Sequence, residues 1–379
     1  MRASGVSRLL LAACVAAGLG TPCPASGSDA PAPARRGGPL TDSPGPLVGV
    51  KIYEPVADTG ALLGEWSRLG IDTAFVAPAF AESGDFVAAA RRRGIRTLLI
   101  VPVFYNPEYL AAHPDAWAIT GRGERAKQEW VEFVCPSRED YRQRRLEEAV
   151  GLLEKHRPDG LSLDFVRHFV FWEKVGPEAR IGPLDTTCFC RGCLARFERD
   201  TGVAVPGDAG ATTTDAARWL LANETDAWTR WRAALVTSWV SDLVREARRV
   251  EPDVVVGAHL VPWGRRDYDD GLLRVAGQDV EALGRLLDYV SPMCYAHMLR
   301  REPSWIARVA EEFARRTDVP VLPSIEVARS YREVELDDAF FAAALRAALA
   351  PPSDGVVLWS WPRLAESPSR REILLRRGR

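Results

Sequence analysis

Eight short apolar segments alternate with helical patterns over residues 47–379, and this alternation constrains the fold more than any other feature of the chain. Each segment is rich in Val, Ile and Leu and apolar on both faces, which is typical of buried parallel strands. The strand candidates are Val48–Tyr53, Thr73–Ala77, Arg96–Phe104, Gly160–Val166, Val254–Val261, Tyr289–Tyr295, Val319–Ile325 and Gly355–Trp361. The alternation predicts a (β/α)8 TIM barrel. A doubly wound open sheet is the alternative, but neither a G-x-G-x-x-G after the first strand nor a Walker A motif is present.

The helical patterns between the strands have the expected 3.6-residue periodicity. Ser137–Asp140 resembles a capping box at the start of one helix. The longest helical region covers 215–250, where Trp and Leu recur at three-to-four spacing. Two connections are much longer than usual, Asn106–Pro136 after strand three and His168–Thr214 after strand four. Both leave carboxyl ends of strands, the face that carries active sites in such barrels, and they could wall an extended substrate site.

The N-terminal residues predict export rather than a part of the fold. Residues 1–23 combine a basic start, a short apolar run and small residues, as in a secretory signal peptide. The alternative is a lipoprotein anchored through Cys14. Residues 24–46 are rich in Pro, Ala, Gly and Ser and predict a disordered linker. No membrane span is expected. The signal-peptide pattern predicts a periplasmic or extracellular protein.

The charge balance excludes one class of partner. The chain has 49 basic and 51 acidic residues and a formal net charge of −2. Such a chain has no excess of positive charge to neutralise phosphates, so no nucleic acid partner is expected.

Asp164 is the first candidate for chemistry. It lies near the top of strand four, in the segment Asp159-Gly-Leu-Ser-Leu-Asp-Phe-Val-Arg167. A carboxylate at a strand end is costly to bury without a purpose. The alternative is a structural Asp paired with Arg167.

This segment resembles the strand-four motif of uncharacterised bacterial glycoside-hydrolase-like barrel families, roughly Asp-Gly-hydrophobic-x-hydrophobic-Asp-aromatic-hydrophobic-Arg. Further segments agree in order over most of residues 47–365. They are Val134–Ser137, Phe171–Glu173, Cys188–Phe197, Asp288–Tyr295 and Gly355–Trp361. The resemblance implies a glycosidase-type barrel acting on a carbohydrate.

A more distant similarity is to family 18 chitinases, whose strand four reads Asp-Gly-x-Asp-x-Asp-x-Glu. Here Ser162 replaces the middle Asp and Val166 the catalytic Glu. Met293-Cys-Tyr295 is similar to that family's Met-x-Tyr, but Ala296 stands where its Asp would be. Because the proton donor is missing, the substrate-assisted chitinase mechanism is not expected here.

Glycoside cleavage usually needs two carboxyl groups flanking the bond. Glu326, at the end of strand seven, is the first choice for the second catalytic carboxyl, with a rim salt bridge to Arg329 as the structural alternative. Glu54, after strand one, is the second choice. Strand-end aromatics could pack on sugar rings or simply fill the barrel top. The predicted substrate-binding residues are Glu54, Tyr53, Tyr105, Arg167, His168, His259, Tyr295, His297, Trp359 and Trp361.

Five cysteines remain after the predicted signal, and three form the cluster Cys188-x-Cys190-x-x-Cys193. Export favours disulfides, with Cys135 as a candidate partner for one of the three. Structural zinc is the alternative, although a fourth ligand is not evident from the sequence. No cofactor and no catalytic metal are expected.

The favoured function is an exported glycoside hydrolase that cleaves a polysaccharide or oligosaccharide. The Val166 and Ala296 departures motivate the alternative, a non-catalytic carbohydrate-binding barrel that has lost its acid. The hypothesis of a metal-dependent hydrolase has less support, because strand one lacks a His-x-His motif and the five histidines are scattered along the sequence.

Overall fold

The computed structural model describes Leu40 and residues 45–82 and 85–377. The proposed signal peptide, the Cys14 lipid site and most of the proposed linker lie outside the described residues.

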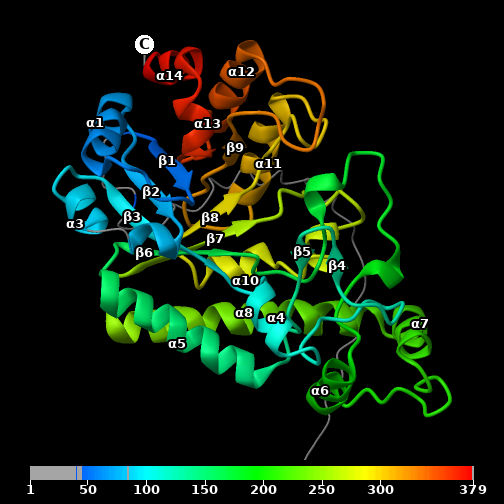
Figure 1. The fold of residues 1–379 in the computed structure, drawn as a ribbon. Helices are drawn as coiled ribbons and strands as arrows, with labels where there is room; N and C mark the ends of the chain where they lie inside the picture. The colour runs from blue at the N-terminus through cyan, green and yellow to red at the C-terminus, as the bar shows by residue number, and fades with distance from the viewer. Residues whose placement is uncertain (1–39, 41–44, 83–84, 378–379) are drawn as a thin grey trace, which may run out of the picture. The chain divides into compact units, whose positions relative to one another are not determined.

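Eight parallel strands form one sheet, and this confirms the predicted (β/α)8 barrel (Figure 1). The strands are β1 Leu47–Ile52, β2 Thr73–Val76, β3 Arg96–Pro102, β6 Gly160–Asp164, β7 Val255–Leu260, β8 Tyr289–Pro292, β9 Ser324–Glu326 and β10 Gly355–Trp359. Their order in the sheet is β8-β7-β6-β3-β2-β1-β10-β9. Parallel bridges from Val290 to Val321 and from Met293 to Ser324 bring the two edges together. A two-stranded hairpin, β4 Lys127–Gln128 and β5 Val131–Glu132, stands apart from the barrel sheet.

Helices connect the strands. They are α1 Thr59–Leu69, α2 Pro78–Ala81, α3 Phe86–Arg91, α4 Pro107–Ala112, α5 Glu139–His156, α6 Arg191–Thr201, α7 Thr213–Asn223, α8 Thr225–Val250, α9 Gly271–Arg274, α10 Val280–Gly284, α11 Ser304–Ala314, α12 Asp338–Leu349, α13 Trp361–Ala365 and α14 Pro368–Leu375, with 3-10 turns η1 Trp172–Lys174 and η2 Pro183–Asp185. The helix expected over 215–250 is interrupted at Glu224, so it forms α7 and α8. The prediction of a capping box at Ser137–Asp140 was wrong, because the N-cap of α5 is Arg138 and its side chain makes no capping hydrogen bond.

The barrel interior is filled at the amino-terminal end of the strands. Inward-facing side chains form a separate hydrophobic cluster that consists of Leu40, Leu47, Phe75, Leu98, Ile100, Val255, Tyr289, Leu322 and Val357. Gly257 makes room there, because a Cβ at this position would lie 2.0 Å from the Tyr289 ring. Leu40 falls in the proposed linker, yet it is buried in this cluster, and its carbonyl accepts a hydrogen bond from Arg96 at 3.1 Å.

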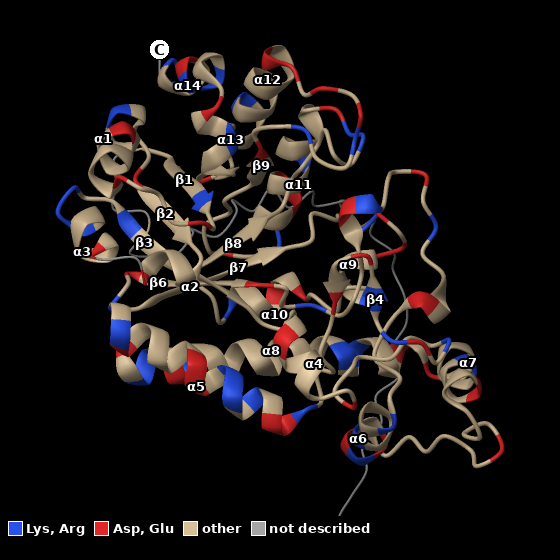
Figure 2. Cartoon of the chain, in the orientation of Figure 1, with Lys and Arg blue, Asp and Glu red and all other residues tan. Residues whose placement is uncertain are grey.

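Charged residues lie mostly on the helices and connections, whereas the barrel strands contain few of them (Figure 2). Helices α5 and α8 pack side by side below the sheet in this view (Figure 1). Among the described residues, no helix combines the length and apolar character needed to cross a membrane.

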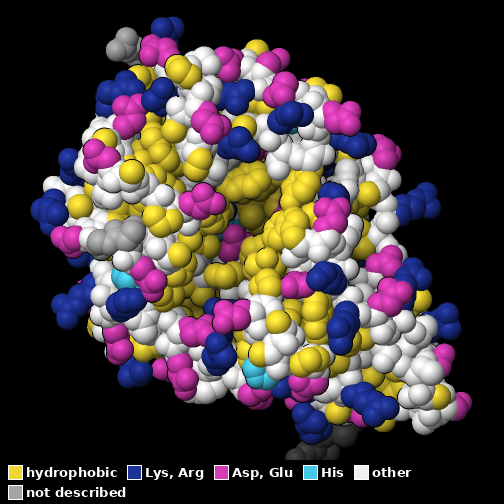
Figure 3. All heavy atoms as spheres, in the orientation of Figure 1, with side chains coloured by type: hydrophobic (Ala, Val, Ile, Leu, Met, Phe, Trp, Pro, Cys, Tyr) yellow, Lys and Arg dark blue, Asp and Glu magenta, His cyan; other side chains and the backbone are white. Residues whose placement is uncertain are grey.

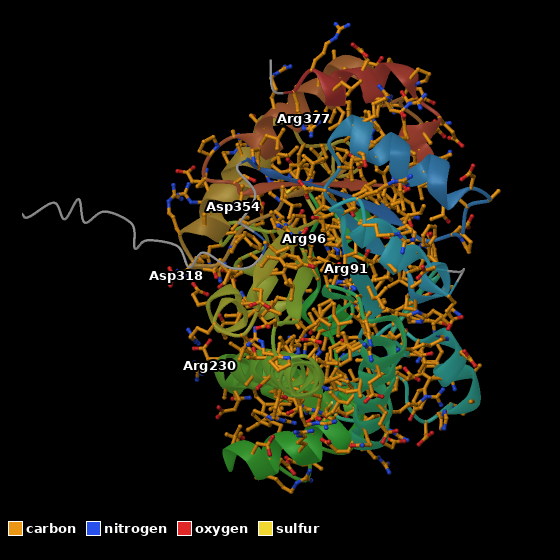
Figure 4. The ribbon with its side chains drawn as sticks, turned by 90° about the vertical axis from the view of Figure 1, so that its left-hand side faces the viewer. Arg91, Arg96, Arg230, Asp318, Asp354 and Arg377 are labelled. Carbon is orange, nitrogen blue, oxygen red and sulfur yellow. The ribbon has the colours of Figure 1, made fainter. Side chains whose placement is uncertain are left out.

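A hollow of about 740 Å³ lies at the amino ends of the strands. Arg91 and Arg96, labelled in Figure 4, line it. Arg91 donates to the carboxylate of Asp159 at 3.2 Å and to the carbonyl of Arg157 at 2.7 Å. Arg91 thus joins α3 to the segment before β6, which is a structural role for this residue.

Candidate functional site

An aromatic cavity of about 490 Å³ lies where the carboxyl ends of the strands meet. Lys51 of β1, Asp164 of β6 and Trp359 of β10 line it, together with residues of the two long connections. Figure 3 shows a hollow near the middle of this face, surrounded mainly by hydrophobic side chains, with acidic side chains close by. This is the end of the barrel at which the sequence predicts the site.

Asp164 is the last residue of β6 and is 8% exposed. Its Oδ1 accepts a hydrogen bond from the backbone N–H of Phe165 at 2.7 Å. Phe165 has φ of 50°, a left-handed conformation that costs a non-glycine residue roughly 1 kcal/mol. The chain thus turns sharply at the strand end, and the carboxylate of Asp164 is held at the cavity.

Glu173 is the second carboxyl group of the cavity. It lies in the 3-10 turn η1, and its Oε2 is buried without a hydrogen-bond partner among the described residues. Burial raises the pKa of Glu173 to about 7, and the negative charge of Asp164 adds to this, whereas Arg167 and Lys51 oppose it. Near neutral pH this carboxyl therefore carries its proton about half of the time, as a general acid requires.

Two buried cations share the cavity with these carboxyls. Burial lowers the pKa of Lys51 to about 8, although Asp164 and Glu173 act in the opposite direction. Arg167 is 2% exposed, and its guanidinium lies 5.0 Å from the ring centre of Phe133 and 5.1 Å from that of Phe165. Its Nη2 donates to the carbonyl of Val170 at 3.2 Å, whereas Nε and Nη1 have no partner among the described residues.

Aromatic side chains form most of the remaining wall. They are Tyr53, Tyr105, Trp130, Phe165, Trp172, Tyr295, Tyr331 and Trp359. Tyr295 and Trp359 stack with ring centres 4.8 Å apart, so each ring covers one face of the other. At the rim, Trp130 Nε1 donates to the hydroxyl of Tyr331 at 2.7 Å, and both residues are more than 40% exposed. Exposed aromatic planes of this kind suit an amphipathic ligand with apolar C–H faces.

Glu326 does not line this cavity. It is 3% exposed, and its Oε1 accepts hydrogen bonds from the backbone N–H groups of His297 at 2.6 Å and Met298 at 3.2 Å. The carboxyl therefore holds the connection after β8 in place. Glu326 is absent from the cavity that Asp164 lines, and Glu173 is the other carboxyl group that lines this cavity.

Glu326 should therefore influence stability. Burial raises its pKa to about 8, so the folded protein binds a proton more tightly than the unfolded chain. The resulting stabilisation is complete below about pH 4.5 and is lost as the pH rises through about 8. The fall in the free energy of unfolding between pH 5.5 and pH 8.5 should be smaller in Glu326→Gln than in wild type. Urea unfolding at both pH values measures this.

The exposed Glu54→Gln is the matched control and should retain the wild-type pH slope. Glu326→Ala should lower the free energy of unfolding by about 1–3 kcal/mol, because two buried N–H groups lose their acceptor. Unchanged stability in Glu326→Ala would contradict this role.

Other predicted residues also lie outside the cavity. Glu54 is exposed and does not line it. His168 is buried against the carbonyl of Arg232, with its Nε2 at 3.3 Å, and His259 Nε2 lies 3.0 Å from the hydroxyl of Ser162. His297 is buried with its ring 5.4 Å from that of Phe340, and Trp361 packs edge-on against Trp66 in the helical layer. The cavity does bring together Tyr53, Tyr105, Asp164, Arg167, Tyr295 and Trp359.

Sequence reasoning missed Lys51, Trp130, Glu173 and Tyr331 as site residues. A signal for Lys51 was available, because a charged residue interrupts the apolar run Val48–Ile52. Glu173 belongs to the motif Phe171–Glu173, but the sequence gives no reason to assign it a catalytic role. Trp130 and Tyr331 are distant in sequence and meet only in the folded chain.

The cysteines differ from the favoured expectation, since the five described cysteines are all unpaired. Cys135 does join the cluster, so a fourth thiol lies beside Cys188, Cys190 and Cys193. The structure therefore contains no disulfide among these four cysteines. Cys135 supplies the fourth metal ligand that is not evident from the sequence.

Comparison with solved structures finds glycoside hydrolases that share the fold of this chain. No protein-family model matches the chain, and no curated protein matches its sequence. The PgaB (BpsB) glycoside hydrolase domain from Bordetella bronchiseptica superposes with a TM-score of 0.65 at 12% identity, over 87% of this chain and 98% of that domain. The β-galactosidase from the psychrophilic Marinomonas ef1 superposes with a TM-score of 0.64 at 14% sequence identity, over 88% of this chain and 59% of that enzyme.

The α-L-fucosidase isoenzyme 2 from Paenibacillus thiaminolyticus gives a TM-score of 0.52 at 10% identity, over 87% of this chain and 48% of that enzyme. The chain thus spans about half the length of the two longer enzymes. At these identities the likeness shows the (β/α)8 barrel fold alone. The resemblance to family 18 chitinases stays a hypothesis.

Proposed function

We propose that this protein is a glycoside hydrolase whose catalytic carboxyl groups are Asp164 and Glu173. The observation that carries the proposal is the placement of both groups in one aromatic cavity at the carboxyl ends of the barrel strands. Burial keeps Glu173 partly protonated near pH 7, so the two carboxyls can take different roles. The glycosidase fold of the structural neighbours supports the same reading.

In this mechanism Glu173 is the general acid. As the bond between the anomeric carbon and the leaving oxygen breaks, that oxygen takes the proton of Glu173. Asp164 either accepts a proton from water as the water oxygen bonds to the anomeric carbon, or attacks that carbon itself before water releases the sugar. Both routes consume one water and yield two sugar products.

Lys51 and Arg167 would hold the substrate rather than react. Both cations lie at the cavity, and Arg167 has two buried N–H-bearing nitrogens without a partner among the described residues. Sugar hydroxyls are suitable acceptors for such donors, while the partly exposed ring of Trp359 can pack against the C–H face of a sugar ring.

A panel of aryl glycosides and polysaccharides tests the proposal. β-Galactosides and α-L-fucosides come first, because two of the structural neighbours are named for these activities. Release of reducing sugar by wild type, with loss of that activity in Asp164→Asn, supports the proposal. Saturable oligosaccharide binding with no product from any substrate would favour the non-catalytic carbohydrate-binding barrel, which the exposed rim aromatics would also serve.

Trp130 should contribute to binding more than to chemistry. Its ring lies at the rim and is 43% exposed, so a sugar unit away from the cleaved bond can pack on it. Trp130→Ala should raise KM for an oligosaccharide about tenfold, equivalent to roughly 1.4 kcal/mol, and change kcat little. Steady-state kinetics measures both constants. Trp130→Phe should recover most of the binding, and an equal loss in kcat with unchanged KM would contradict this role.

We also propose that the protein is exported, which rests on the N-terminal sequence pattern alone. Fractionation of cells that express the full chain, followed by mass spectrometry of the N-terminus, distinguishes cleavage of a signal peptide from lipidation at Cys14.

A further inference from the structure

We propose that Cys135, Cys188, Cys190 and Cys193 together bind one zinc ion that fixes the walls of the cavity. The four Sγ atoms lie within 4.8 Å of one another. Three of the residues are close in sequence, but Cys135 comes from the other long connection, more than 50 residues earlier. Only folding brings the four thiols together.

The spacing of the sulfurs fits one central ion. Zinc binds thiolates at about 2.3 Å in a tetrahedron, which separates the sulfurs by about 3.8 Å. Cys135 Sγ lies 3.4 Å from Cys190 Sγ and 3.5 Å from Cys193 Sγ, and 4.8 Å is the upper bound for the group. A disulfide would instead require about 2.05 Å between two sulfurs.

The surroundings of the sulfurs are suited to negative charge. The backbone N–H of Ile119 donates to Cys188 Sγ at 3.3 Å, and that of Cys193 donates to Cys190 Sγ at 3.4 Å. Cys190 is also the N-cap of the eleven-residue helix α6, where the helix dipole favours an anion. The buried guanidinium of Arg232 interacts electrostatically with Cys188 and Cys193. Four thiolates around one divalent cation leave a net charge of −2, which these groups partly offset.

The ligand set indicates a structural ion. Zinc sites with four protein ligands are closed, whereas catalytic zinc keeps a position for water or substrate. The ion would join the connection after β3, which carries Trp130, to the connection after β6, which carries Glu173. The backbone hydrogen bonds from Gly121 to Thr186 and from Phe189 to Ile119 already join these connections beside the cysteines, and a metal cross-link at the same place would hold that junction further.

The first test is the metal content of the purified full chain, measured by plasma mass spectrometry. We expect about one zinc per chain. Cys190→Ser should reduce this severalfold, whereas Cys294→Ser is the matched control and should leave it unchanged, since Cys294 is buried outside the group. Protein without zinc, with two disulfides among the four cysteines in a non-reducing peptide map, would overturn the proposal.

A second readout does not depend on whether the serine variant folds. Wild-type protein produced with cobalt should show the intense visible absorption of tetrahedral cobalt thiolate, and titration with a mercurial reagent should remove that absorption as the thiols react. A weak absorption, typical of octahedral cobalt with oxygen or nitrogen ligands, would contradict the four-thiolate site. Neither result depends on glycosidase activity, so failure of this proposal and failure of the proposed function can be distinguished.

Discussion

Asp164→Asn should lower kcat/KM by about 10²–10⁴-fold, because an amide can neither accept a proton from water nor attack the anomeric carbon. The shape of Asn is nearly that of Asp, and its amide oxygen can still accept the hydrogen bond from Phe165 N–H. The thermal midpoint should therefore change little. Initial rates on the most reactive substrate, together with thermal unfolding, measure both quantities.

The matched control is Asp208→Asn, an exposed carboxyl that accepts a hydrogen bond from the neighbouring N–H of Ala209. It should keep wild-type rates. Turnover by Asp164→Asn within a few-fold of wild type, in a folded protein, would remove Asp164 from the mechanism.

Glu173→Gln should have the second large effect, and its size should depend on the leaving group. General acid catalysis contributes about 10²–10⁴-fold, so cleavage of unactivated oligosaccharides should fall by that order. Aryl glycosides whose leaving group is already a weak base need less protonation and should lose much less. Parallel assays of one oligosaccharide and one dinitrophenyl glycoside give the comparison.

The pH profile provides a second signature of Glu173. With a pKa raised to about 7, the acid is protonated below that pH and loses its proton above it, so wild-type kcat/KM should fall as the pH rises beyond about 7. Glu173→Gln should lack this basic limb. Glu178→Gln, an exposed carboxyl in the same connection, should retain it. An unchanged basic limb in Glu173→Gln would assign that ionisation to another group.

The fold could be predicted because barrel strands are buried on both faces, and this leaves largely apolar runs such as Val254–Val261 in the sequence. The break between α7 and α8 at Glu224 could not be predicted, because the apolar periodicity of the sequence continues across it.

The candidate site was predictable only where a strand end fixes the side chain. Asp164 follows directly from its place at the end of β6. Glu326 also ends a strand, but its carboxylate accepts hydrogen bonds from the N–H groups of His297 and Met298. The direction of its side chain therefore depends on how the connection after β8 folds, which the sequence does not indicate. Glu173 lies in a short turn within a long connection, whose path is set by contacts distant in sequence.

The most direct test of the central claim is the fate of water oxygen during turnover. Wild-type protein should be incubated briefly with the most reactive glycan in ¹⁸O-labelled water, and the products analysed by mass spectrometry against an enzyme-free control. Glycoside hydrolysis in the Asp164–Glu173 cavity predicts one labelled oxygen at each new reducing end, with labelled product from Asp164→Asn reduced by about 10²-fold or more. Tight glycan binding without any labelled product, or equal labelling by the variant, would contradict it.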